Sequence, residues 1–75
     1  MTLRQLTETA RVVAEMVSRI DCAPPDARTF DVPIPEDAEV REHLVVILRR
    51  RYAPPEWAVD AGAGELGHFV RVSRD

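Results

Sequence analysis

The 75-residue sequence predicts a small α+β domain, a two-layer α-β-α-β-β arrangement in which two helices pack on a three-stranded sheet. Apolar residues recur at helical spacing in two segments and alternate at strand spacing in three others. Prolines or glycines separate most of these segments. A chain of this length supports a single hydrophobic core, so we expect residues 1–75 to form one domain.

The segment from Pro35 to Tyr52 is predicted to be the central helix. Its apolar residues follow the spacing of one helical face, at Val40, Leu44, Ile47, Leu48 and Tyr52. Pro35 suits the first helical position, and Pro54-Pro55 stops the helix. We expect this face to be buried against the sheet, with the closest packing at Leu44, Ile47 and Leu48. Val46 falls on the opposite side, either as a lone exposed valine or as a contact for a partner.

A second helix is predicted near the start of the chain, where Thr2 and Gln5 have the spacing of a capping box. Apolar residues then recur every three or four positions, as in a heptad seam, at Leu3, Leu6, Ala10, Val13, Val17 and Ile20. Two interpretations fit this pattern. The helix packs on its own sheet, or the seam also pairs with a second copy of the chain in a homodimer.

Three segments have the alternation of half-buried strands. In the first, Phe30, Val32 and Ile34 alternate with Asp31 and Pro33. Prolines at 33 and 35 remove donors from one side of this strand, which predicts an edge strand whose open side cannot pair further. Residues 57–61 and 68–73 are predicted to form a hairpin with its turn at residues 62–64. A right-handed crossover through the central helix predicts that the first two strands are parallel and that the sheet is mixed.

The alternation sends Phe69 and Arg71 to the side of the sheet away from the buried residues. An aromatic side chain beside an arginine on an open sheet has three explanations. The first helix covers it, a second copy or another protein covers it, or a nucleic-acid base stacks on it. We favour a protein interface and expect Val46, Phe69 and Arg71 to contribute to it.

Three consecutive arginines, Arg49, Arg50 and Arg51, end the central helix. Positive charge at a helix C-terminus compensates the helix dipole. The same side chains are candidates for anion contact, as in a small nucleic-acid-binding protein. Because consecutive helical residues point in different directions, the three cannot all meet one ligand.

The sequence contains no pattern that indicates catalysis. Cys22 is the only cysteine, and it precedes a double proline without the context of a catalytic thiol. The two histidines and Cys22 lack the paired spacing of a zinc site, and no glycine-rich phosphate loop is present. We therefore expect no enzymatic activity, no metal and no cofactor.

The formal net charge of −3 disfavours general binding to nucleic acids. The first residues already have helical spacing, with no apolar leader and no membrane-spanning run, so we expect a cytoplasmic protein without a membrane partner. Size and composition are typical of small accessory or inhibitor proteins of bacterial viruses, which act by binding a host protein. We therefore predict a non-enzymatic protein-interaction domain. The alternative is a small nucleic-acid-binding module that uses the three arginines or the sheet face around Phe69 and Arg71.

Overall fold

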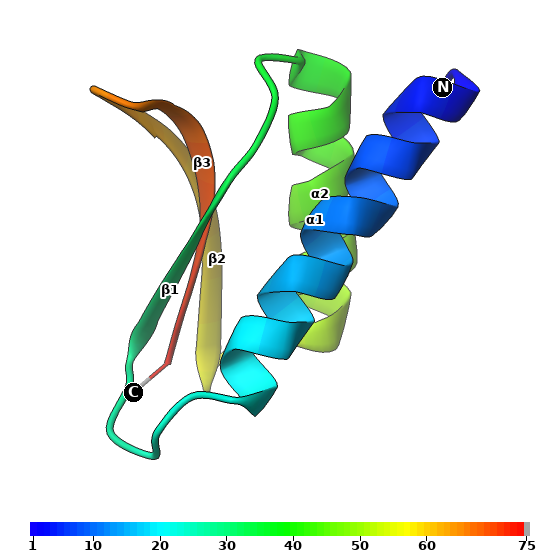
Figure 1. Cartoon of the computed structure of the whole chain (residues 1–75). Coiled ribbons are helices and arrows are strands. Elements are labelled where there is room, and N and C mark those ends of the chain that lie inside the picture. The colour runs from blue at the N-terminus through cyan, green and yellow to red at the C-terminus, as the bar shows by residue number, and fades with distance from the viewer. Residues whose placement is uncertain (75) are drawn as a thin grey trace.

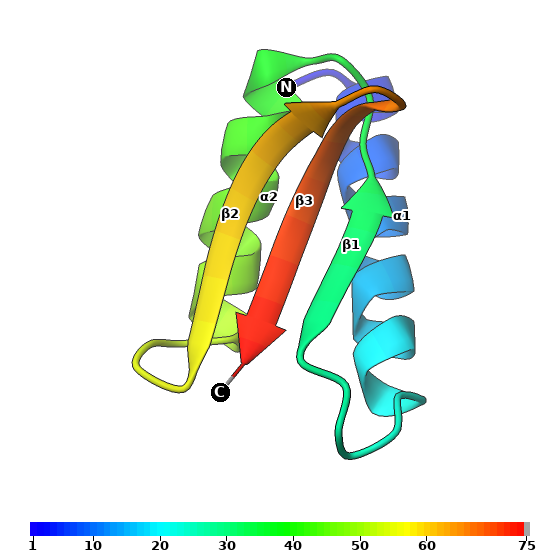
Figure 2. The ribbon, with the colours of Figure 1, turned by 90° about the vertical axis from the view of Figure 1, so that its left-hand side faces the viewer.

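The computed structural model describes residues 1–74, and their fold is α+β. The elements in chain order are α1 (Leu3–Asp21), β1 (Thr29–Pro33), α2 (Ala38–Arg51), β2 (Trp57–Gly64) and β3 (Gly67–Arg74). Both helices lie on the same side of a three-stranded sheet (Figure 1). The other side of the sheet is crossed by neither helix (Figure 2).

The sheet is antiparallel, so the predicted mixed sheet is wrong. Its strand order is β1-β3-β2, and β3 runs antiparallel to both neighbours. β1 and β2 do point in the same direction, but β3 lies between them (Figure 2). The short turn after β2 returns the chain directly alongside it. Val70 and Val72 of β3 are fully buried, and a central strand is where both helices can cover such residues.

β1 is an edge strand, and its outer side is blocked as the prolines predicted. On its inner side, the amide of Ile34 donates to the carbonyl of His68 at 3.0 Å. Because backbone groups alternate along a strand, Pro33 and Asp31 face the open edge. Pro33 offers no donor there. Nη1 of Arg19 in α1 donates to the outward carbonyl of Asp31 at 3.0 Å.

The first helix begins with the capping box that the sequence predicted. The Thr2 hydroxyl accepts from the amide of Gln5, and the side-chain oxygen of Gln5 accepts from the amide of Thr2. The buried side of α1 is offset from the heptad seam and consists of Thr9, Val12, Met16 and Ile20. Ile20 is the only member of that seam with a buried side chain.

The sequence predicted that the central helix begins at Pro35, but α2 begins at Ala38. Asp37 is its N-cap, with a carboxylate oxygen that accepts from the amides of Glu39 and Val40 at 3.0 and 3.2 Å. Nε2 of Gln5 donates to the carboxylates of both Asp37 and Glu39, which ties the N-terminal ends of the two helices together. The fully buried residues of α2 include Leu44 and Leu48. Ile47 is only half-buried, contrary to the expectation.

The β2–β3 turn lies at Glu65-Leu66, not at the three residues that the sequence indicated. Gly62 and Gly64 belong to β2, and Gly62 pairs with Phe69 of β3. Gly67 begins β3 with a φ of 108°, a left-handed conformation that favours glycine. The hairpin end of the sheet curves away from the helices (Figure 1).

Candidate functional site

The uncovered side of the sheet, here called the open face, is the first candidate site. Strand register aligns its outward side chains in rows of three across β1, β3 and β2. One row is Pro33, Phe69 and Gly62, and the next is Asp31, Arg71 and Asp60. The third row consists of Thr29, Ser73 and Ala58. Because both helices lie on the other side, the possibility that α1 covers Phe69 is excluded.

Phe69 lies flat over a glycine of the neighbouring strand. A methyl group placed on Gly62 would be only 2.9 Å from Cζ of Phe69. The guanidinium carbon of Arg71 is 5.1 Å from the ring centroid. Phe69 is therefore held in place on the open face while part of its ring remains accessible.

The guanidinium of Arg71 is engaged by its neighbours. Nε and Nη2 donate to the two carboxylate oxygens of Asp31 at 2.8 and 3.1 Å, a bidentate pair across β1 and β3. The hydrogen bond and charge of Asp31, with the charge of Asp60, raise the pKa of Arg71 above its usual value. This row has two carboxylates and one guanidinium, so it offers no unpaired positive charge to an anion.

Beside Phe69, the open face continues into a hollow of about 570 Å³ at the hairpin end of the sheet. Pro33, Phe69 and Leu66 provide much of its apolar lining. Leu66, at the hairpin turn, is fully exposed. Glu65 and Asp31 add carboxylates to the lining, and Arg19 contributes a side chain that already binds the carbonyl of Asp31. The hollow is thus apolar at its centre, with charged groups of both signs around it.

The three consecutive arginines of α2 do not form one cationic surface. Arg49 bends to β2 and donates from Nε and Nη2 to the carbonyl of Val59. Arg51 lies over the ring of Tyr52, with 5.9 Å between its guanidinium carbon and the ring centroid. Arg50 is exposed, with no ion pair in the described part of the chain.

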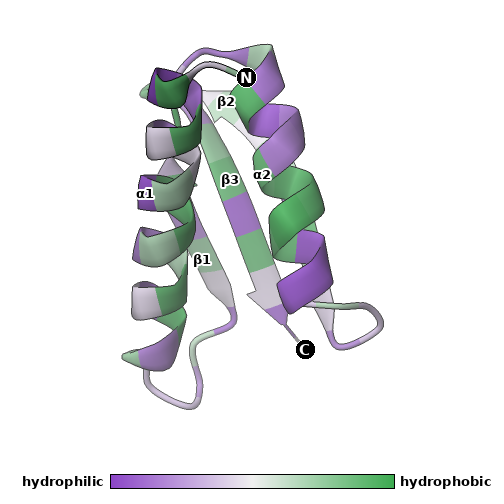
Figure 3. Cartoon of the chain, turned by 90° about the vertical axis from the view of Figure 1, so that its right-hand side faces the viewer, coloured by the Kyte–Doolittle hydropathy of each residue, from purple (hydrophilic) through white to green (hydrophobic). Residues whose placement is uncertain are grey.

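The predicted dimer seam divides between surface and core. Leu3, Leu6 and Ala10 are exposed, Val13 and Val17 are half-buried, and Ile20 belongs to the core. Val46 is exposed on α2, on the side opposite its buried residues. In the view onto the helices, apolar segments recur along the whole of α1 (Figure 3). The helical layer is therefore a second candidate surface.

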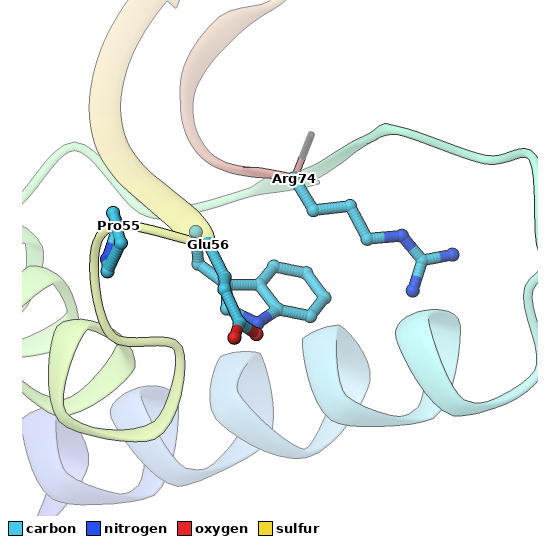
Figure 4. Close-up of a pocket in the computed structure, with 4 residues that line it drawn as sticks. Pro55, Glu56 and Arg74 are labelled. Atoms are coloured by element: carbon cyan, nitrogen blue, oxygen red, sulfur yellow. The ribbon is translucent and has the colours of Figure 1, made fainter.

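A hollow that the sequence did not indicate lies at the opposite end of the sheet, between Trp57 and Arg74 (Figure 4). The guanidinium of Arg74 lies about equally far from two aromatic rings, 5.6 Å from Phe30 and 5.5 Å from Trp57. Its Nε donates to the carbonyl of Ala27 at 2.9 Å. Arg74 thus fastens the loop after α1 to the end of β3, a structural role. No sequence pattern links an arginine to partners so distant along the chain.

The remaining reactive side chains are scattered. Cys22 is exposed at the C-terminal cap of α1. Nδ1 of His68 is buried without a hydrogen-bond partner among the described residues, and its Nε2 is 3.7 Å from a carboxylate oxygen of Glu36. Residues 1–74 contain no group of three histidine, cysteine or acidic side chains that could hold a metal ion. Within the same range, neither helix has the length and apolar character needed to cross a membrane.

Comparisons with protein families, with curated proteins and with solved structures gave no match to this chain. The functional argument therefore depends on the geometry of the two candidate surfaces.

Proposed function

We propose that this protein is a non-enzymatic interaction domain that binds another protein through its open face. The ligand is a short segment that places a large apolar side chain against Phe69 and Leu66 and a lysine or arginine beside it. One observation carries the proposal: Arg71 is already paired with Asp31 and stacked on Phe69. The apolar part of the open face is available, while its positive charge is not.

The charges around Phe69 support a basic segment. Asp60 has no ion pair among the described residues, and Glu65 is exposed at the turn. A phosphate backbone would be repelled by these carboxylates, whereas a lysine or arginine would be attracted to them. An exposed aromatic ring beside an arginine is also the type of residue that dominates protein interfaces.

Nucleic-acid binding is the alternative function. It would depend on stacking at Phe69 and on the arginines at the end of α2. None of the three has an ion pair in residues 1–74, but only Arg50 is free of the contacts that direct Arg49 to Val59 and Arg51 to Tyr52. Such binding would weaken steeply with added salt, because phosphate contacts release counterions.

The test is selection from a displayed library of random linear peptides, with the wild-type protein as bait. We expect enriched sequences to combine a large apolar residue with a nearby lysine or arginine. Phe69→Ala and Leu66→Ser should each weaken binding of an enriched peptide by about tenfold or more, the effect of losing a central apolar contact. Val46→Ser is the matched control, because it removes an exposed apolar side chain from the other layer.

Thermal melts of every variant separate binding from folding. Equal peptide affinity for wild type and Leu66→Ser would contradict the proposal, because Leu66 is too exposed to affect the fold. A single-stranded oligonucleotide is titrated in parallel. Oligonucleotide binding that weakens with salt and is lost in Phe69→Ala, with no peptide enriched, would establish the alternative function.

A further inference from the structure

One side of α1 is uncharged from Leu3 to Val17. At about 100° per residue, the charged residues of α1 up to Arg19 fall within an arc of about 80°, at Arg4, Glu8, Arg11, Glu15 and Arg19. A neighbouring arc of about 120° also contains Asp21 at the C-terminal end of α1, but its other residues are apolar apart from one threonine, at Leu3, Leu6, Thr7, Ala10, Val13, Ala14 and Val17. We name this second set the α1 stripe. A solvated helix face normally carries charged residues, so the α1 stripe is unusual.

The monomer buries the α1 stripe only in part: Val13 and Val17 are half-buried, and Val13 packs against the core. Leu3 is 80% exposed and Leu6 is 48% exposed. The core contacts of α1 come instead from Val12, Met16 and Ile20, on a different side of the helix. The N-terminal half of the heptad seam, at Leu3, Leu6 and Ala10, therefore lies on a surface that the chain's own core does not use.

The order of residue sizes along the α1 stripe indicates what covers it. Large side chains lie near its two ends, and Ala10 lies at its middle. If a second α1 runs antiparallel with the two-fold axis at Ala10, Leu3 of one copy faces Val17 of the other. The same arrangement places Leu6 opposite Ala14 and Thr7 opposite Val13. Leu6 then faces a much smaller residue, and the two Ala10 residues allow the helices to approach closely.

We propose that two copies of this chain associate through the α1 stripe, with antiparallel helices and a two-fold axis at Ala10. An interface of this kind is isologous, so one surface serves as both partners. Antiparallel helices also bring opposite dipole ends together. This proposal is independent of the proposed function, because the α1 stripe and the open face belong to opposite layers (Figures 1 and 3). The dimer would present two open faces on its outer sides and would bind a partner bivalently.

The size of the α1 stripe sets the strength of this dimer. A helix of 19 residues is about 28 Å long and about 10 Å wide. Contact through α1 alone therefore covers roughly 280 Å² in projection, less than the about 800 Å² per partner of stable interfaces. Val46, exposed on the outer side of α2, has to contribute as well. We expect a reversible dimer in the micromolar range.

Sedimentation equilibrium over a concentration series is the first test. The wild-type mass should rise from 8.5 kDa towards twice that value as concentration increases. Ala10→Arg should weaken the dimer by more than about tenfold, because it places two cations together on the axis. Ser18→Arg is the matched control: Ser18 is also exposed on α1, but outside the α1 stripe. Ser18→Arg should leave the dimer unchanged, and Ala10→Arg should leave peptide binding to the open face unchanged.

Disulfide cross-linking tests the antiparallel geometry. In a Cys22→Ser background, Ala10→Cys should oxidise to a covalent dimer, because residues on the axis come within disulfide distance. Ser18→Cys in the same background should stay monomeric under the same conditions. A single 8.5 kDa species at high micromolar concentration would overturn the proposal. So would a dimer that survives Ala10→Arg, or equal cross-linking of the two cysteine variants.

Discussion

The guanidinium of Arg49 donates two hydrogen bonds, of 3.3 and 3.1 Å, to the backbone carbonyl of Val59. Backbone groups of successive residues along β2 point alternately towards β3 and away from it. The carbonyl of Val59 is one that points away from β3, towards the open edge of β2. Arg19 has the same role at the other edge, where it binds the outward carbonyl of Asp31. Each helix thus contributes one arginine to an edge of the sheet. Covering backbone groups in this way prevents edge strands from pairing with other chains.

Replacing Arg49 with alanine should lower the free energy of unfolding by about 1 kcal/mol and increase aggregation, because a strand edge loses its cover. Arg50→Ala is the matched control, since Arg50 carries the same charge at the next position and is exposed. Its cost should stay within about 0.5 kcal/mol. Urea melts give the free energies, and light scattering during incubation gives the aggregation. Equal behaviour of the two variants would show that the Arg49 contact does not protect the edge.

Leu48→Ala should cost about 2–5 kcal/mol, the range for truncating a core leucine. Leu48 is fully buried in the main hydrophobic cluster, so the substitution leaves a cavity between α2 and the sheet. Val46→Ala, two positions away and exposed, should cost less than about 0.5 kcal/mol at concentrations where the protein is monomeric. The two values are compared in denaturant melts. A cost below about 0.5 kcal/mol for Leu48→Ala would contradict the core assignment.

The sequence predicted the existence of the elements and the inside–outside pattern of the strands, because those depend on local spacing. It did not predict the buried side of α1, which is offset from the heptad seam. The capping box at Thr2, the blocked edge at Pro33 and the outward direction of Phe69 were all correct. Each depends on residues a few positions apart along the chain, where helical or strand geometry fixes the relationship.

Properties that depend on pairing between distant residues could not be obtained from spacing. The position of β3 between β1 and β2 is one example, because it depends on which strands pair across long separations in the sequence. The pairing of Arg71 with Asp31 is another, since these residues are 40 positions apart. That pair leaves Arg71 without the unpaired positive charge that the alternative, nucleic-acid binding on the open face, would use.

The N-cap of α2 should make the stability depend on pH in the acidic range. Hydrogen bonds from the amide of Val40, the side chain of Gln5 and the amide of Glu39 hold the pKa of Asp37 below its usual value. A lowered pKa in the folded state means that the ionised form stabilises the protein above the unfolded-state pKa. This contribution is lost as the pH falls through the folded-state value.

Asp37→Asn keeps a good capping side chain but removes the titrating group. Between about pH 5 and pH 2, its free energy of unfolding should therefore fall less steeply than that of the wild type. Urea melts at several pH values measure both slopes, with Asp26→Asn as the control because Asp26 lies in an exposed loop. Parallel slopes for wild type and Asp37→Asn would exclude the capping carboxylate as a source of the acid sensitivity.

Gly62 and Phe69 should be energetically coupled, because the ring occupies the space that a side chain at residue 62 would need. Gly62→Ala would place a methyl group 2.9 Å from Cζ of Phe69 and force the ring to move, at a cost of about 1 kcal/mol. In a Phe69→Ala background the space is free. The same substitution should then stabilise the strand by about 0.5 kcal/mol, because alanine loses less backbone entropy than glycine.

A double-mutant cycle of denaturant melts measures this coupling, which should be about 1–2 kcal/mol. Gly64→Ala is the control within the same strand, because a methyl group there would lie at an ordinary distance of 3.9 Å from the ring. Its effect should therefore be similar in both backgrounds. If Gly62→Ala and Phe69→Ala are additive, the ring does not lie over Gly62 in solution. Phe69 would then be mobile on the open face, and the preformed apolar surface on which the proposed peptide site depends would be lost.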